Sequence, residues 1–432
     1  MKRDAIIRLR EWKNNPRRKP GLLVGARQVG KTYLMKEFGR EDFAQVAYLS
    51  LDTDEKWAQI FSHVSPRDLL PLLKAATRIE IDQDTLIILD EIQEVPRALL
   101  SLKYFQEEAP EYHVLAAGST LGVAMRQGVS FPVGKVDFIN LYPLTFGEFL
   151  QACGEGQLRS LLSDLDFTDL AAFHQQLLNL LRQYLVVGGM PEAVAEYAQS
   201  HNFTQVRRHH QNILNAYERD FSKYAGKELS VRVREVWQSL PRQLARENKK
   251  FVFGAVREGG RGKNYDLAID WLKDSSLIHK SSRVNQPISP LAIYQEPAIF
   301  KIFLHDVGLL ATLSQADIGL IAEGHQIFSH FNGALTEQYI AQELVALGMQ
   351  LHYWARTNST AEIDFLLDSP ATHAVPVEVK SGINLQAKSL KVYQEKYAPP
   401  LAVRTSAADY KQTGNLYDIP LYAFSEFVKN KL

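Results

Sequence analysis

The chain has 432 residues, with 49 Lys plus Arg and 49 Asp plus Glu, so its formal net charge is zero. This balance excludes a global positive field of the kind that attracts nucleic acid, and any DNA site must be a local patch. The length predicts about two to four domains. The single cysteine, Cys153, excludes an internal disulfide and a four-cysteine zinc site and suits a reducing cytoplasm. No apolar run reaches the roughly 20 residues that span a bilayer, and the basic start lacks a signal-peptide core, so we expect a cytoplasmic protein without membrane contact.

A phosphate-binding loop is the first motif along the chain. Residues 25–32 read Gly-Ala-Arg-Gln-Val-Gly-Lys-Thr, which fits the pattern G-x-x-x-x-G-K-[ST] between a predicted buried strand and a predicted helix. In such a loop, backbone N–H groups surround phosphates at the positive end of the helix. We expect Lys31 to reach the β- and γ-phosphates of ATP and Thr32 to ligate Mg²⁺, whereas a chance glycine turn is the alternative. The expected ATP-binding residues of the loop are Gly25, Ala26, Arg27, Gln28, Val29, Gly30, Lys31 and Thr32.

An apolar strand that ends in two carboxylates follows at residues 86–91. Asp90 is placed to hold Mg²⁺ through a water molecule and Glu91 to polarise the attacking water, and phosphoryl transfer needs little more from a protein. A strand that merely ends at a polar turn is the alternative. A third strand, at residues 114–117, ends in Gly-Ser-Thr, where Ser119 or Thr120 could sense the γ-phosphate, although small polar residues also dominate ordinary turns.

The order of loop, Asp-Glu strand and polar strand end resembles the AAA+ superfamily, with Ser119 or Thr120 at the place of its sensor-1 residue. The stretches Leu-Asp-Glu-Ile-Gln at 89–93 and Leu-Tyr-Pro-Leu-Thr-Phe-Gly-Glu-Phe-Leu at 141–150 narrow the resemblance. They are similar to prokaryotic AAA+ ATPases of the archaeal-ATPase-like group, over essentially the whole chain. The resemblance implies ATP at a subunit boundary, and therefore a homo-oligomer, for which a hexamer is one candidate.

That group carries Gly-Arg before the second stretch, whereas this chain has Gly134-Lys135. If the arginine acts on a neighbour's nucleotide, Lys135 keeps its charge but loses its planar fork. Arg126 is the other candidate for such a finger. Ordinary surface cations are the alternative for both residues.

Strand-like runs at 22–24, 46–51, 86–89, 114–117 and 136–139 alternate with helical stretches. This rhythm predicts a parallel sheet between helices, with ATP at the carboxyl ends of the strands. We assign residues 1–150 to the AAA+ P-loop core. Residues 151–228 predict a helical lid or linker, in which Gly-Gly-Met-Pro at 188–191 stops one helix and starts another.

Residues 229–322 look like a winged helix. The pattern predicts helices near 233–245 and 264–273 and wing strands near 277–284 and 299–304. Such a unit can lay its second helix in a major groove, so we expect DNA as a partner on fold-level analogy. The cations available to neutralise phosphate are Arg246, Lys249, Lys250, Arg261 and Lys263. A solvated basic face and a protein-docking role are the alternatives.

A second set of charged residues lies in the range 323–432. Glu337 falls on a predicted helix, Asp364 on a strand, and Glu378 and Lys380 two apart on the next strand and so on one face. Two carboxylates that hold Mg²⁺ and an ammonium that orients water are what a metal-dependent phosphodiesterase requires. The ordered set resembles the PD-(D/E)xK nuclease fold in its Holliday-junction-resolvase-like branch. The resemblance implies Asp364 and Glu378 as metal ligands and adds Glu337 and Lys380 to the catalytic residues.

The expected fold class is α/β, with a P-loop AAA+ parallel sheet and helical lid, then a winged-helix domain and a PD-(D/E)xK nuclease-like domain. The expected function is Mg²⁺-dependent ATP hydrolysis coupled to DNA binding and metal-dependent DNA cleavage. The alternative is an ATP-gated switch or scaffold whose C-terminal region binds nucleic acid or protein without cleavage, because folds host inactive relatives.

Overall fold

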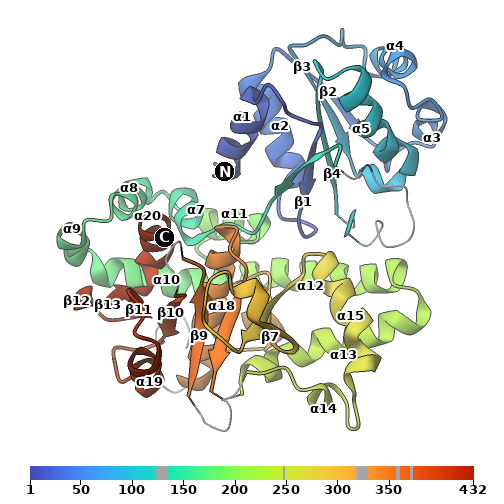
Figure 1. Cartoon of the computed structure of the whole chain (residues 1–432). Helices are drawn as coiled ribbons and strands as arrows, with labels where there is room; N and C mark the ends of the chain where they lie inside the picture. The colour runs from blue at the N-terminus through green and yellow to red at the C-terminus, as the bar shows by residue number, and fades with distance from the viewer. Residues whose placement is uncertain are drawn as a thin grey trace. The chain divides into compact units, whose positions relative to one another are not determined.

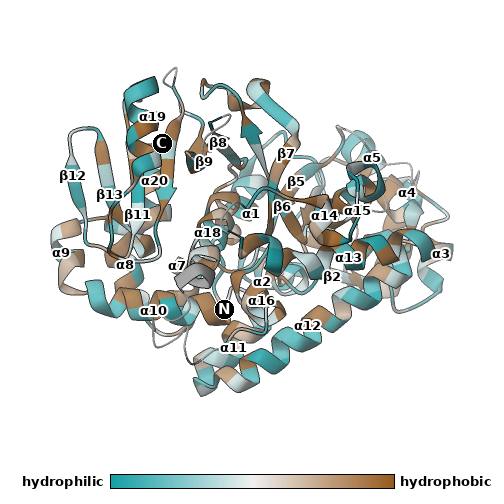
Figure 2. Ribbon diagram, turned by 90° about the horizontal axis from the view of Figure 1, so that it is seen from below, coloured by the Kyte–Doolittle hydropathy of each residue, from teal (hydrophilic) through white to brown (hydrophobic). Residues whose placement is uncertain are grey.

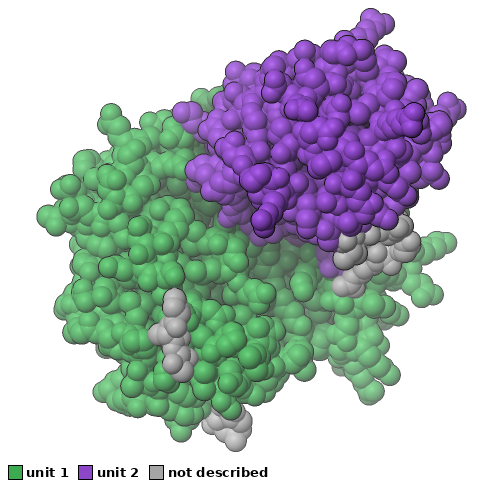
Figure 3. Space-filling view, turned by 45° about the horizontal axis from the view of Figure 1, so that its top comes forward, with its two compact units in different colours: residues 1, 143–273, 277–432 green, residues 2–142, 274–276 purple. Residues whose placement is uncertain are grey.

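The computed structural model describes residues 1–119, 121–122, 132, 134–246, 249–317, 319, 329–356, 361–369 and 373–432. For residues 329–332 it describes the backbone alone. The chain divides into two compact units, coloured separately in Figure 3. The N-terminal unit comprises residues 2–142 and 274–276. The C-terminal unit comprises residues 1, 143–273 and 277–432.

The N-terminal unit is built on a five-stranded sheet in the order β2-β3-β4-β1-β5. Its strands are β1 (Gly21–Val24), β2 (Gln45–Ser50), β3 (Thr85–Asp90), β4 (His113–Gly118) and β5 (Asp137–Asn140). Every pairing in this sheet is parallel. The predicted parallel sheet is therefore confirmed, and the carboxyl ends of β1, β3 and β4 share one edge.

Helices cover both faces of this sheet (Figure 1). α1 (Ala5–Asn14) and α2 (Lys31–Asp42) pack on one face. α3 (Lys56–Ile60), α4 (Pro66–Thr77) and α5 (Pro96–Glu108) pack on the other, and the short helix η1 (Ile92–Glu94) follows β3. Strand side chains alternate between the two faces, so each apolar strand supplies both layers of core.

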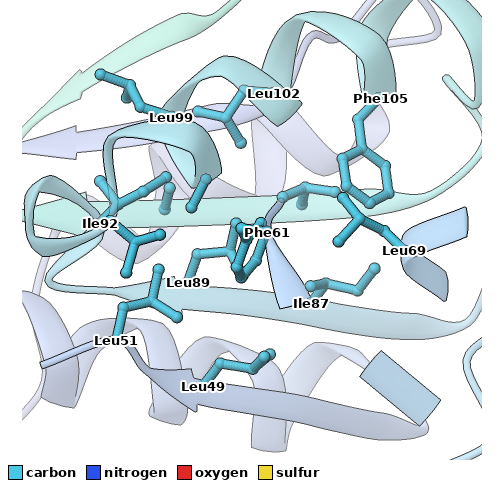
Figure 4. Close-up of a cluster of buried hydrophobic side chains, with 14 of the residues drawn as sticks. Leu49, Leu51, Phe61, Leu69, Ile87, Leu89, Ile92, Leu99, Leu102 and Phe105 are labelled. Carbon is cyan, nitrogen blue, oxygen red and sulfur yellow. The ribbon is translucent and has the colours of Figure 1, made fainter. Parts of the chain in front are cut away.

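The core under α3, α4 and α5 is drawn in Figure 4. Leu49, Ile87 and Leu89 project from the strands towards Phe61 and Leu102. All five side chains are fully buried. Burial of side chains of this size contributes about 1.5–3 kcal/mol each, which fixes the sheet whose edge carries the phosphate loop.

The C-terminal unit is built on an eight-stranded mixed sheet in the order β12-β13-β11-β10-β9-β8-β6-β7. Its strands are β6 (Ile278–Val284), β7 (Gln295–Leu304), β8 (His352–Ala355), β9 (Glu362–Leu367), β10 (Val375–Val379), β11 (Ala402–Ser406), β12 (Lys411–Thr413) and β13 (Leu416–Pro420). β6 and β7 form an antiparallel hairpin, and β6 also pairs in parallel with β8. The two strands predicted as a wing therefore lie in the same sheet as those predicted for the nuclease-like domain.

The order of elements around the second charged set is α18 (Ser329–Ala346), β8, β9, β10, α19 (Lys388–Tyr397) and β11. Each of these was predicted from the sequence: helices at 335–347 and 385–397, and strands at 351–355, 362–367, 375–380 and 401–404. β12, β13, the short helix η4 (Leu421–Ala423) and α20 (Phe424–Lys431) were not. The nuclease-like and winged-helix identities of these ranges stay predictions.

The helices predicted as a lid belong to the C-terminal unit, where α10 packs on α16 and α18. Those before the second sheet are α7 (Phe146–Ala152), α8 (Gly156–Asp164), α9 (Phe167–Ala172), α10 (His174–Val187), α11 (Pro191–Ser200), α12 (Phe203–Tyr224), α13 (Lys227–Leu244), α14 (Phe253–Val256) and α15 (Gly262–Asp274). The hairpin encloses η2 (Leu291–Tyr294) and leads into α16 (Val307–Leu313). Hydrophilic and hydrophobic residues mix along α12, as its colours in Figure 2 show. Its buried positions recur at helical spacing, the pattern of a helix packed on one side.

The predicted helix stop at 188–191 is confirmed, since α10 ends at Val187 and α11 begins at Pro191. The Gly189 N–H donates to Asp306 Oδ2 at 2.6 Å, and the Leu144 N–H donates to the Gly189 carbonyl at 2.7 Å. Gly188 has φ +65°, and a Cβ there would lie 2.3 Å from Asp306 Oδ1. The turn therefore requires glycine and anchors the 141–150 stretch to Asp306.

Within the described ranges, no helix has both the length and the apolar character of a membrane span.

Candidate functional site

The phosphate loop connects β1 to α2, and glycine is needed at both of its ends. A Cβ at Gly25 would lie 2.2 Å from the Leu141 carbonyl oxygen, and Gly30 has φ +92°. Ala26 and Val29 are buried, whereas Arg27 and Gln28 are exposed. The loop therefore presents its backbone at the carboxyl edge of the sheet, as a phosphate-binding loop requires.

Lys31, the first residue of α2, turns back over this loop. Its ammonium donates to the Gly25 carbonyl at 2.8 Å and to the Ala26 carbonyl at 2.9 Å. The residue is only 7% exposed, and this burial lowers the pKa of Lys31 to about 8, although Glu91 and Asp90 oppose the shift. A single buried cation thus faces the inside of the loop.

Asp90 lies beside Thr32, as predicted. Thr32 Oγ1 donates to Asp90 Oδ2 at 2.6 Å, and Tyr48 Oη donates to the same oxygen at 3.0 Å. Burial raises the pKa of Tyr48 to about 12, so the phenol stays a donor at neutral pH. A hydroxyl and a carboxylate are oxygen ligands of the kind Mg²⁺ prefers, so this pair fits a magnesium ion held with ATP. The sequence analysis missed Tyr48. The feature that could have identified it is a side chain with a hydroxyl on β2, the strand next to β3.

Glu91 and Ser119 also come together. Ser119 Oγ donates to Glu91 Oε2 at 3.1 Å, and Gln93 Nε2 donates to the same atom at 2.6 Å. Glu91 has φ +50°, an uncommon conformation for a residue with a side chain. The candidate base is therefore restrained by two neighbours, of which Gln93 was not predicted.

The remaining predictions near ATP concern the sensor and the finger. Thr120 and Arg126 lie outside the described residues. Lys135 Nζ forms an ion pair with Glu107 Oε1 at 2.9 Å, and both side chains are about one-third exposed. Within its own chain, Lys135 is thus paired at the surface.

The second charged set converges in the C-terminal unit. Glu378 pairs with Lys380 Nζ at 2.6 Å, and Asp364 Oδ2 accepts from the Val379 N–H at 2.8 Å. Glu337 and Asp364 both lie within 4.0 Å of one further cation, Lys301. The structure therefore brings the four predicted residues, Glu337, Asp364, Glu378 and Lys380, to one centre. We call its carboxylates, together with the unpredicted Glu362 beside Lys301, the acidic centre: Glu337, Glu362, Asp364 and Glu378.

Two cations that the sequence analysis did not assign to this centre occupy it. Lys301, on β7, is 0% exposed and lies 2.5 Å from Glu362 Oε1. Lys249 forms an ion pair with Glu337 Oε1 and is not among the solvated cations. Two features of the sequence could have pointed to Lys301 and its partner. One is a charged residue inside the apolar run 299–304, and the other is Glu362, two residues before Asp364 on the same strand.

Burial sets the pKa values of these carboxyl groups. It raises the pKa of Asp364 well above the ordinary value, with Glu337 and Glu378 adding to the shift. It also raises the pKa of Glu378 despite Lys380. Burial alone would raise the pKa of Glu337, but Lys249 and Lys301 hold it below its ordinary value. Burial would likewise lower the pKa of Lys301, and the surrounding carboxylates raise it instead.

The acidic centre does not fit a divalent ion in this arrangement. Among the described residues, no group of three or more His, Cys, Asp or Glu side chains is arranged to hold a metal. Glu337 Oε2 and Glu378 Oε2 are buried without a hydrogen bond and so retain acceptor capacity. The carboxylates nevertheless already contact ammonium groups, which take the place of a metal's charge.

Three family models match separate parts of the chain. Residues 17–150 match an AAA domain. Residues 178–318 and 332–424 match two families that are each described as a domain of unknown function. No curated protein matches the chain.

Three solved structures show limited similarity. The Walker-type ATPase of Pyrococcus abyssi is 15% identical with a TM-score of 0.42, over 72% of this chain and 94% of that one. Cdc6p of Pyrobaculum aerophilum is 14% identical with a TM-score of 0.25, over 74% and 92%. The Orc1 protein of Aeropyrum pernix, solved with DNA, is 16% identical with a TM-score of 0.24, over 78% and 93%.

The phosphate loop, the Asp-Glu strand end and the parallel sheet agree with the family match. Residues 17–150 are therefore an AAA domain of the P-loop ATPase type.

Proposed function

We propose that the chain hydrolyses ATP with Mg²⁺ and that its nucleotide state controls DNA binding by the C-terminal unit. One observation carries the first part. Lys31, Thr32, Asp90, Glu91 and Ser119 lie at the carboxyl edge of one parallel sheet, where Lys31 bonds to the loop, Thr32 to Asp90 and Ser119 to Glu91. Clamps, a metal-holding pair and a water-positioning carboxylate are nearly all that phosphoryl transfer needs.

Each residue has a distinct task in this proposal. Lys31 exchanges its bonds to the loop carbonyls for bonds to phosphate oxygens. Thr32 and Asp90 would hold Mg²⁺, which supplies charge stabilisation when bound. Glu91 orients the attacking water and takes up its proton, while Ser119 keeps the carboxylate aimed.

Steady-state ATP turnover and nucleotide affinity of Lys31→Ala test the ATP site. We expect both to be lost, because the buried ammonium is the cation inside the loop. Lys74→Ala is the matched control, since Lys74 lies on α4 and pairs at the surface with Glu80. Unchanged nucleotide affinity in Lys31→Ala would remove the phosphate-loop assignment.

The DNA part rests on the cations near α14 and α15. Those that are exposed are Arg246, Lys250, Arg261 and Lys263. We expect Arg261→Ala plus Lys263→Ala to weaken duplex binding and flatten its salt dependence, because each phosphate contact releases counterions. Binding should also differ between Glu91→Gln with ATP and wild type with ADP. Equal affinities in the two nucleotide states would refute the coupling.

A homo-oligomer, with a hexamer as one candidate, and a cytoplasmic location remain part of the proposal. The mass of Glu91→Gln with saturating ATP, measured by light scattering, tests the first. A monomer under these conditions would contradict it.

Metal-dependent DNA cleavage is a second candidate, favoured by the convergence of Glu337, Asp364, Glu378 and Lys380. It requires an ion among carboxylates that already contact lysines. The test is cleavage of linear, single-stranded and branched DNA with Mg²⁺ or Mn²⁺ by the wild type and by Lys380→Ala. Cleavage that the variant loses would establish a nuclease, and absence of cleavage would favour binding alone.

A further inference from the structure

A buried lysine joins three elements of the C-terminal unit. Lys301 projects from β7 and lies 2.5 Å from Glu362 on β9. The same ammonium is 3.8 Å from Glu337 on α18 and 4.0 Å from Asp364 on β9. It also lies 4.9 Å from the centre of the Tyr353 ring on β8. One cation thus contacts three carboxylates and a π-face, the surroundings of a counter-ion.

Two more lysines bring the cations at the acidic centre to three. Lys249 pairs with Glu337, and Lys380 pairs with Glu378 at 2.6 Å. Three ammonium groups therefore lie within ion-pair distance of the four carboxyl groups, one fewer than full charge balance requires. Buried charges are retained in proteins only when they are paired in this way or coordinate a metal.

Lys301 is held in place by its backbone as well as by its charge. It lies opposite Ser281 in the β6–β7 ladder, and it is 0% exposed. Its removal would leave the partly buried Glu362 and Asp364 without an ammonium partner, which is unfavourable. A divalent ion binds carboxylate oxygens at about 2.0–2.6 Å, so it would have to share their surroundings with an ammonium of the same sign.

We infer that Lys301 takes the place of a divalent ion in the acidic centre, with Lys249 and Lys380 as auxiliary cations. The centre then holds β7, β9 and α18 together without a metal. This inference goes beyond the proposed function and is independent of ATP hydrolysis. It implies that the C-terminal unit binds DNA without cleaving it. Metal-dependent DNA cleavage, the second candidate above, is the alternative that the tests below distinguish.

Mn²⁺ titration of the full chain without nucleotide is the first test, followed by electron paramagnetic resonance. The chain carries Asp90→Asn, so that the ATP site does not contribute a metal. We expect no Mn²⁺ site that depends on Asp364, and the same melting temperature in EDTA and in Mn²⁺. One bound Mn²⁺ per chain that disappears with Asp364→Asn would overturn the inference, whatever the ATPase result.

Lys301→Met in the same background is the second test. It preserves the length of the side chain and removes its charge. We expect a lower melting temperature and at least tenfold tighter Mn²⁺ binding, with Mn²⁺ restoring part of the lost stability. Adding Asp364→Asn should abolish that rescue.

Lys280→Met is the matched control, because Lys280 lies on β6 with its ammonium over the Phe300 ring. It should leave Mn²⁺ binding unchanged. If Lys301→Met folds with wild-type stability and gains no Mn²⁺ site, the inference is wrong. If it does not fold, the titration of the Asp90→Asn chain decides alone.

Discussion

In the proposed mechanism, Glu91 depends on its neighbours for the orientation that hydrolysis needs. Its Oε2 atom accepts from Gln93 and from Ser119. We expect Glu91→Gln to bind ATP normally and to lower kcat by about 10²-fold or more, the usual contribution of a general base. Gln93→Ala should lower kcat less and leave nucleotide affinity unchanged. Single-turnover hydrolysis measures both, and wild-type turnover in Glu91→Gln would exclude its role as base.

Tyr48 contacts the proposed metal-holding residue Asp90, to which its hydroxyl donates at 3.0 Å. Partners of metal-holding carboxylates typically contribute about 10–100-fold in metal affinity. We therefore expect Tyr48→Phe to raise the Mg²⁺ concentration that half-activates ATP turnover, with little change in kcat at saturating Mg²⁺. Tyr104→Phe, on α5, is the control. An unshifted Mg²⁺ curve in Tyr48→Phe would show that the hydrogen bond has no such role.

Among the elements, the turn between α10 and α11 contains Gly188, and substitution there can test why glycine occurs at this position. Gly188 and Gly226 both have positive φ, but only Gly188 has a neighbour that a Cβ would meet, namely Asp306. We expect Gly188→Ala to lower the free energy of unfolding by about 2–4 kcal/mol, combining backbone strain and overpacking. Gly226→Ala should cost about 1 kcal/mol from the backbone alone. Urea denaturation compares the two, and equal losses would show that contact with Asp306 is unimportant.

The sequence predicted the helices and strands better than it predicted which strands pair and which side chains meet. Most strands of the two sheets are apolar runs that a local pattern detects, so β9 was placed at its observed bounds, whereas the polar strand β12 was missed. Pairing of β6 with β8 joins segments about 70 residues apart, for which no local pattern exists. For the same reason, Lys301 gave no sign of its partners, and Lys249 was taken for a surface cation. The ATP site was predictable because its residues are held by one loop and adjacent strand ends.

For the whole molecule, buried histidines lower the stability of the fold at acid pH. His210 and His305 are each 1% exposed, and burial lowers the pKa of both to about 4. Each is neutral when folded but titrates near 6.5 when unfolded, so its stabilising contribution is present above pH 6.5 and is lost as pH falls through about 4. The shift of His210 corresponds to about 3 kcal/mol.

The measurement is the urea midpoint of His210→Gln and of the wild type from pH 7 to pH 4. We expect the variant to lose less stability over this range. Comparison with the wild type is needed because burial raises the pKa of Asp306 to about 6 and of Glu343 to about 7, which opposes the histidine effect. Parallel curves for the two proteins would contradict the assignment.

The division of the chain into units has a consequence for how it can be cut into fragments. Residues 274–276 belong to the N-terminal unit, so the polypeptide crosses between units after Met1, after Tyr142, after Lys273 and after Ser276. A fragment that stops at residue 142 therefore lacks part of its own unit, including Asp274, whose carbonyl oxygen lies beside Gly122.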